Sequence, residues 1–470
     1  MTRIRIHTGL DCCERLAGDP MLEELKNKLG PLWYYAALIF IAQRLGDVIN
    51  TLIGLWLVPK YVCPSELGAV LALAQVGGVL GIPLAILLVP FEKFLNIFAA
   101  HAEYGKVKSL LRDALILVAL SIVGAYACSF FFMPHVYERM RVSDGLLTHL
   151  IVISGVLSTV SPLFLVAMQA AKKFRQLSIL SVLSAPVRLL VLLIALPLRG
   201  LAGYFIGQVF TDGFNMGYSL LALKNPFFTN VKCVSYWSHW REIWHYTWPI
   251  IFLTIAGRIQ TTTEFFAVRH WLTDTESGAY YFITRFAEIP ICLWTATRMV
   301  FFPLVSEKHD SGQNTLRMFY QTVLLILLGG GAVIGLFHIA FPFVLSLLPM
   351  WQRYMDYAPL LGVVGATCVV RTAFACFIAY ETACRRFGFV VYTVAFYLIE
   401  AVLLYCIGGI GFFEGWLPTH VIQWVRSCDL VSLRSFSWVV LVFSTVLLFV
   451  ALSHQRVSEK RIVKNEGAWA

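Results

Sequence analysis

The run LSILSVLSAPVRLLVLLIALPL, residues 177–198, decides the fold of this chain. Its one charged residue is Arg188. A helix needs about 20 apolar residues to cross the hydrocarbon core of a bilayer, and the run lacks the alternation that a barrel strand requires. Backbone groups in lipid must bond within their own segment. The run is therefore predicted to be a transmembrane helix.

Composition extends this interpretation to the whole chain, which has 470 residues, 59% of them hydrophobic and 14% charged, with a mean hydropathy of +0.74. That is more apolar surface than one soluble core can hide. We predict an all-α, polytopic membrane protein of about twelve transmembrane helices. They are expected at 33–58, 68–90, 114–133, 146–169, 177–198, 201–223, 247–270, 278–302, 319–341, 357–380, 388–409 and 435–453. The stretch 411–434 fits an outer loop or an interfacial helix.

Basic residues are concentrated in alternate connections between these runs, as at Lys172, Lys173 and Arg175. The positive-inside rule then predicts that both termini are cytoplasmic. The first thirty residues lack an apolar core, so the first helix is expected to direct insertion into the inner (plasma) membrane. The formal charge of +10 is spread over short clusters with no basic domain or stripe, which argues against nucleic acid as a partner. The eleven cysteines include no C-x-x-C pair, so no metal site is expected.

An internal repeat is the most informative pattern. Four short motifs recur in order at a spacing of 210–214 residues. They are Ile41–Arg44 with Ile255–Arg258, Glu66–Ala69 with Glu276–Ala279, Pro90 with Pro303, and Lys172–Phe174 with Arg385–Phe387. Two halves of six helices each insert the same way round, related by an axis along the membrane normal, and a substrate site is expected between them near the midplane. An inert duplicated scaffold is the alternative.

The repeat divides the chain into five segments. We expect a cytoplasmic N-terminal segment at 1–30, an N-terminal lobe at 31–224, a cytoplasmic linker at 225–245, a C-terminal lobe at 246–454 and a cytoplasmic tail at 455–470.

Six arginines lie inside predicted helices, namely Arg44, Arg188, Arg258, Arg285, Arg298 and Arg371. Each costs about 2.5–3.5 kcal/mol at a helix centre, so these side chains should face protein or water. Arg298 and Arg371 lie toward the inner surface, which their side chains could reach by snorkelling. Arg44, Arg188, Arg258 and Arg285 lie too deep for easy snorkelling. For these four we favour a functional role.

Nearby acids complicate that interpretation. Asp47 follows Arg44 by three residues and Glu288 follows Arg285 by three, so each pair could be a self-neutralising structural ion pair. Arg258 has no acid three or four residues away in its own helix. A mid-membrane guanidinium of this kind needs an anionic partner, and a lipid-linked phosphate suits its planar, always protonated fork.

Short motifs resemble those of a known group. Residues 57–61 and 64–69 are similar to the connection after helix 1 of polysaccharide flippases, with Cys63 in place of a glycine. Residues 169–174 and 303–308 resemble their junctions after helices 4 and 8. The resemblance spans roughly 33–410 and names an O-antigen-type flippase of the multidrug/oligosaccharidyl-lipid/polysaccharide (MOP, MATE-like) exporter superfamily. It implies two lobes around a cleft lined by helices 1, 2, 7 and 8, working by alternating access. The region 411–453 departs from the pattern.

Three functions follow as hypotheses. The first is a flippase that moves a polyprenyl-diphosphate-linked oligosaccharide, a cell-surface polysaccharide precursor, across the inner membrane through a cationic cavity, without enzyme chemistry or a cofactor. Glycan-assembly membrane proteins and membrane lipids are its expected partners. The second is a Na⁺- or H⁺-coupled multidrug exporter, and the third a membrane oligosaccharide polymerase or ligase, which the short connections disfavour. The expected substrate-binding residues are Arg44, Arg258, Arg285, Arg298, Asn50 and Gln260. The ion-coupling candidates are Asp47, Glu264 and Glu288.

Overall fold

The computed structural model of the chain is built from helices alone within the part that it describes. That part comprises residues 31–100, 103–140, 145–171, 173–223, 232–289, 301, 305, 308, 313–347, 349–384, 386–408 and 432–466. The predicted 1–30 segment, residues 411–431 of the ambiguous stretch 411–434, and Arg298 lie outside it.

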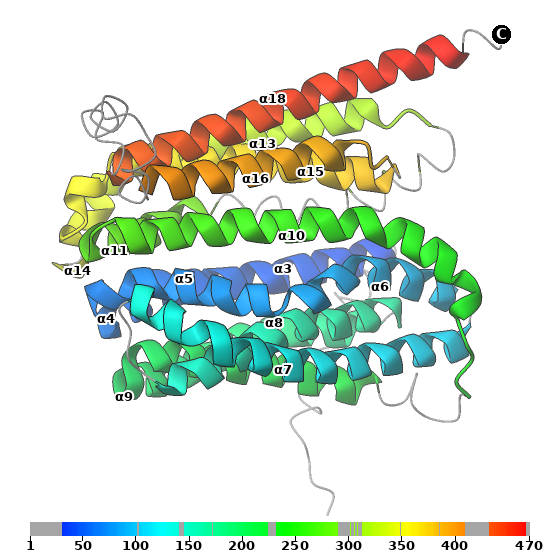
Figure 1. The fold of residues 1–470 in the computed structure, drawn as a ribbon, viewed down its shortest axis with the longest axis horizontal. Coiled ribbons are helices and arrows are strands. Elements are labelled where there is room, and N and C mark those ends of the chain that lie inside the picture. The colour runs from blue at the N-terminus through cyan, green and yellow to red at the C-terminus, as the bar shows by residue number, and fades with distance from the viewer. Residues whose placement is uncertain are drawn as a thin grey trace, which may run out of the picture.

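The N-terminal half contains α3 (Pro31–Leu52), η1 (Ile53–Leu57), α4 (Val58–Tyr61), α5 (Pro64–Leu80), α6 (Ile82–Ala100), α7 (Tyr104–Met140), α8 (Gly145–Ala170) and α9 (Phe174–Leu223). The C-terminal half contains η3 (Trp237–His239), α10 (Trp240–Trp271), α11 (Asp274–Ala287), α13 (Leu316–Ser346), α14 (Pro349–Gln352), η4 (Met355–Tyr357), α15 (Leu360–Ala383), α16 (Phe389–Gly408) and α18 (Leu433–Glu466). The helices lie side by side, with the blue-to-teal half on one side, the orange-to-red helices on the other and α10 between them (Figure 1).

Most of these helices correspond to predicted spans, and the differences lie at their ends. Among the described residues, six helices are long and apolar enough to cross a membrane, and α5 with α6 forms a seventh candidate bent by 69°. The first predicted span continues through a π-helical turn, η1, into α4. At the other end, α18 runs on to Glu466, so residues 455–466 of the predicted tail extend the last helix.

The spans predicted at 177–198 and 201–223 are the two arms of α9. Gly200, with φ 50° and ψ −121°, breaks the helix between them, a conformation that glycine adopts without steric cost. A Cβ on Gly203 would lie 2.2 Å from the Ala195 carbonyl oxygen, and one on Gly207 would lie 2.3 Å from Leu192. The arms therefore pack directly against each other, and the Gly203-x-x-x-Gly207 spacing, which puts both glycines on one helix face, is what allows it.

Close helix packing also fixes α5 against α8. A Cβ on Gly155 would lie 2.1 Å from the Gly77 carbonyl oxygen, so the two backbones touch where these glycines cross. One apolar core lies inside each half, around Phe94 in the first and Phe377 in the second. A third core joins the halves and includes Leu71 of α5 and Tyr281 of α11.

Two hydrogen bonds also cross between the halves near α4. The Trp351 indole N–H donates to the Leu55 carbonyl at 2.9 Å, and the Arg353 guanidinium donates to the Pro59 carbonyl at 3.2 Å. Because the Lys and Arg distribution predicts that this end of the bundle is extracellular, the lobes are joined at the predicted outer side.

Candidate functional site

The first group of predicted site residues lies inside the N-terminal lobe, between α3 and α9. Arg44 and Asp47 form an ion pair at 2.9 Å, as their spacing predicts. They border a cavity of about 280 Å³. It is lined by Gln43, Arg44, Gly46, Asp47, Asn50, Leu165, Leu180, Ser181, Ser184, Ala185 and Asn215. The cavity is thus polar on its α3 side, with both signs of charge present.

Two buried amide oxygens show that this polarity is not satisfied within the lobe. Gln43 Oε1 and Asn215 Oδ1 have no hydrogen-bond partner among the described residues. A buried acceptor without a donor costs about 1–3 kcal/mol, so such groups are suited to receive a hydroxyl or a water. The cavity can therefore bind a ligand or a water that donates hydrogen bonds to these oxygens.

Asn50 connects this cavity to a second arginine. Arg188 of α9 donates to Asn50 Oδ1 at 3.1 Å and to the Tyr204 hydroxyl at 3.4 Å. Its guanidinium carbon lies 5.6 Å from the centre of the Tyr204 ring, which allows a cation–π contact. Arg188 has no carboxylate within ion-pair distance in the described structure, so its charge is held by a neutral amide and a phenol.

Arg258 lies where α10 of the second lobe meets α5 of the first. A Cβ placed on Gly78 of α5 would lie 2.9 Å from Arg258 Nη1, so the guanidinium lies directly against the α5 backbone at this glycine. No hydrogen bond or ion pair of Arg258 is formed within the described ranges. The sequence showed only that its own helix supplies no acid three or four residues away, and no other described helix supplies one either, so the guanidinium remains available at the lobe interface.

Arg285 lies at the same interface but is paired. Its Nη1 is 2.8 Å from Glu288 Oε2, as the spacing predicts, and its guanidinium carbon lies 5.3 Å from the centre of the Tyr281 ring. A Cβ built on Gly54 of η1 would lie 3.5 Å from Arg285 Cδ. The Arg285 side chain therefore packs against the π-helical turn. Such turns are frequent at functional sites. The structure thus brings Arg258 and Arg285 to one interface, on α10 and α11.

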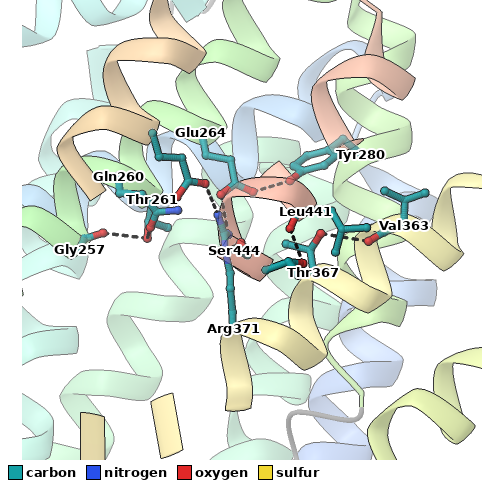
Figure 2. A network of polar contacts seen from close by, with 12 residues as sticks. Gly257, Gln260, Thr261, Glu264, Tyr280, Val363, Thr367, Arg371, Leu441 and Ser444 are labelled. Atoms are coloured by element: carbon teal, nitrogen blue, oxygen red, sulfur yellow. Dashed lines mark hydrogen bonds and ion pairs between the residues drawn. The ribbon is translucent and has the colours of Figure 1, made fainter. Parts of the chain in front are cut away.

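A buried charge cluster lies inside the C-terminal lobe, and the sequence did not reveal it. Arg371 of α15 donates to Glu264 Oε2 of α10 at 2.6 Å, to Glu400 Oε1 of α16 at 2.8 Å and to Ser444 Oγ of α18 at 3.1 Å. Tyr280 of α11 donates to the other Glu264 oxygen at 2.5 Å (Figure 2). One guanidinium therefore connects side chains from five helices, and we call this group the Arg371 cluster.

The Arg371 cluster shows where this side chain lies. Snorkelling toward the inner membrane surface was one possibility for Arg371, but its guanidinium lies inside the lobe, against two carboxylates that are each only 3% exposed. A carboxylate buried in a membrane needs a cation, and Arg371 supplies it. The lone acid Glu400 in the apolar run 388–409 was the available signal.

Gln260 also faces the inside of this lobe. It is 5% exposed, and its Oε1 accepts a hydrogen bond from the Thr261 hydroxyl at 3.3 Å. It lies one helical turn before Glu264, and Figure 2 shows it beside the same network. The predicted residues thus occupy three places. Arg44, Asp47 and Asn50 lie in the N-lobe cavity, Arg258, Arg285 and Glu288 at the lobe interface, and Gln260 and Glu264 in the C-terminal lobe.

Comparison with solved structures identifies the class to which this fold belongs. No protein-family model and no curated protein matches the sequence. Solved structures do match: an inward-facing multidrug resistance MATE family transporter of the MOP superfamily has a TM-score of 0.65 at 10% identity, over 91% of this chain and 99% of its own. A mutant of the Vibrio cholerae MATE transporter VcmN has a TM-score of 0.59 at 10% identity, over 91% and 97% of the two chains.

A third match is a MOP superfamily transporter from Pyrococcus furiosus, described by the reversed polarity of its binding pocket, with a TM-score of 0.56 at 12% identity over 90% and 95% of the two chains. The fold of this chain is therefore the MATE transporter fold, which confirms the predicted all-α architecture of about twelve helices in two repeats. At these identities the likeness defines the fold alone.

Proposed function

We propose that this protein is a membrane transporter that moves an anionic lipid-linked substrate, a polyprenyl-diphosphate-linked oligosaccharide, between the two leaflets of the inner membrane. The observation that carries the proposal is Arg258, a guanidinium at the lobe interface with no acid partner in the described structure. A half-buried cation within a membrane span is stabilised by an anion, and a diphosphate presents several oxygens to the guanidinium.

Neighbouring groups support the same substrate class. Arg285 lies at the same interface, and Arg188 is held by neutral partners next to the N-lobe cavity. The amide groups of Gln43 and Asn215 are of the kind that hydrogen-bond to sugar hydroxyls. Translocation of such a substrate by a MATE-like fold needs no covalent step. With both termini cytoplasmic, the substrate would enter from the cytoplasmic side, where glycan-assembly membrane proteins would supply it.

A multidrug exporter is the second candidate, favoured by the MATE transporters among the solved structures and by one observation. Asp47 faces the N-lobe cavity, where its carboxylate could bind a cationic drug or a coupling Na⁺ or H⁺. The Arg44 pair at 2.9 Å opposes this function, because the cation already occupies one side of the carboxylate. Glu264 is similarly engaged by Arg371 at 2.6 Å.

Transport by the purified protein in liposomes distinguishes the two. The substrate is a fluorescent polyprenyl-diphosphate oligosaccharide, and its exposure to an external quencher reports transfer between leaflets. Arg258→Gln should lower the initial rate by about 10- to 100-fold, the value of one hydrogen bond to a charged group, and Arg258→Lys should lower it less.

Arg317→Gln is the matched control, because Arg317 lies in the same lobe, on α13, but is exposed. It should transport like the wild type. Wild-type transfer of a cationic drug with no transfer of the lipid-linked sugar would support the exporter instead. Equal rates for Arg258→Gln and the wild type would remove the anionic-cavity argument.

A further inference from the structure

A row of exposed aromatic side chains runs along the segment that enters α10. Trp237, Trp240, Trp244 and Trp248 are spaced by three or four residues, which places them on one helix face, and each is 44% to 61% exposed. The Trp237 and Trp240 rings lie 4.9 Å apart and the Trp240 and Trp244 rings 6.1 Å apart. We call these four residues the tryptophan stripe. Phe252, 53% exposed, continues it toward the middle of α10.

The segment that carries the stripe is fastened to the other lobe. The Val234 N–H donates to the Gly105 carbonyl at 3.1 Å, and a Cβ on Gly105 would lie 2.7 Å from the Val234 side chain. The Tyr236 hydroxyl donates to Asp113 Oδ2 of α7 at 3.0 Å. Burial and the Asp113 carboxylate raise the pKa of Tyr236 to about 12, so the hydroxyl stays a donor at neutral pH.

Two ring contacts continue this attachment along α6. The His239 ring lies 5.5 Å from the Phe98 ring, edge to face, and Lys93 Nζ lies 3.6 Å from the centre of the Tyr246 ring. The segment therefore has a fixed position against α6 and α7, although the stripe itself faces outward. These contacts fix the segment, so the outward orientation of the tryptophans is set by the fold.

Charge distinguishes this surface from an ordinary lipid-facing helix. Lys232 and Arg241 are exposed on the segment that carries the stripe, and Glu242, also exposed, is the one acid between 232 and 248. Tryptophan prefers the boundary between headgroups and hydrocarbon, where its ring is apolar and its N–H is wet. Basic side chains at the same level attract anionic headgroups. The Lys and Arg distribution predicts that this end of the bundle faces the cytoplasm.

We propose that the tryptophan stripe together with Lys232 and Arg241 is a binding surface for anionic phospholipids of the cytoplasmic leaflet. The rings insert at the headgroup level, and the two cations pair with lipid phosphates and acidic headgroups. Because the segment is fastened to α6 and α7 and also begins α10, bound lipid would touch both lobes at their inner ends. The inference is independent of the proposed substrate.

Brominated lipids test this surface, because bromine quenches tryptophan fluorescence on contact. The full-length protein is placed in nanodiscs of phosphatidylcholine with a minority of phosphatidylglycerol, and bromine is carried by one lipid or the other. The signal from the stripe is the wild-type quenching minus that of the variant in which Trp237, Trp240 and Trp244 are all phenylalanine. Brominated phosphatidylglycerol should quench it more, beyond its share of the lipid.

Charge variants separate an anionic-lipid site from general lipid contact. Lys232→Gln and Arg241→Gln should each lower the preference for phosphatidylglycerol by about fivefold while total quenching is retained. Trp438→Phe, which removes an exposed tryptophan from α18, should leave the preference unchanged. Three results would overturn the proposal: no quenching assigned to the stripe, equal quenching by the two lipids, or an undiminished preference in both charge variants.

Discussion

Arg371→Met should destabilise the C-terminal lobe strongly. The substitution keeps an apolar stem of similar length but leaves Glu264 and Glu400 facing each other, each 3% exposed and without a guanidinium. Removing one partner of a buried ion pair costs about 3–5 kcal/mol. Because the Arg371 side chain is 32% exposed, we take the lower end, about 3 kcal/mol, which is about a hundredfold in the unfolding equilibrium.

A double-mutant cycle separates the charge interaction from lost packing. The free energy of unfolding is measured by denaturant titration in mixed micelles for the wild type, Arg371→Met, Glu400→Gln and the double variant. Glu400→Gln should cost little, because Glu264 and Arg371 remain as a matched pair. In the Glu400→Gln background, Arg371→Met leaves one bare carboxylate instead of two, so its cost should fall by at least about 1 kcal/mol.

Two results would refute this reasoning. One is a loss below about 0.5 kcal/mol for Arg371→Met, the size of an ordinary surface change. The other is exact additivity of the two substitutions, which would mean that Arg371 and Glu400 do not interact in the folded protein.

Two further substitutions test the packing and the helix ends. Gly155→Ala should destabilise by about 1–3 kcal/mol, because the methyl group would collide with the Gly77 carbonyl of α5; Gly124→Ala, where nothing lies within 4 Å, is its control, and equal thermal stability of the two variants in detergent would contradict the packing. Thr273→Ala removes the capping box in which Thr273 and Glu276 bond each other's backbone N–H groups, and should cost about 0.5–2 kcal/mol. Thr273→Ser should retain most of that stability, whereas equal losses in both variants would argue against the cap.

Sequence periodicity and composition predict this fold well because lipid imposes a single rule on every span. A run such as 177–198 must be helical, and its length follows from the thickness of the bilayer. Helix ends were harder to predict, because polar residues outside the hydrocarbon can continue a helix. The extension of α10 back to Trp240 and of α18 on to Glu466 are the clearest cases.

Ion pairs among the candidate residues could be anticipated only where one helix supplies both partners. Spacing alone indicated the pairs of Arg44 with Asp47 and Arg285 with Glu288, because residues three apart share a helix face. Spacing gives no information about partners on other helices. Arg371 meets carboxylates 107 and 29 residues away, and only tertiary packing brings them together.

The π-helical turn in the first span has a consequence for the outer end of the molecule. In a regular helix the Leu55 carbonyl would accept a hydrogen bond from residue 59, but Pro59 has no N–H to give. The Leu55 carbonyl accepts a hydrogen bond from the Trp351 indole of the other lobe, at 2.9 Å. The π-helical turn thus supplies the acceptor of a hydrogen bond between the two lobes. Because the Leu55 carbonyl can return to solvent at a net cost of about 0.5–1.5 kcal/mol, this hydrogen bond contributes only modestly to holding the two lobes together at that end.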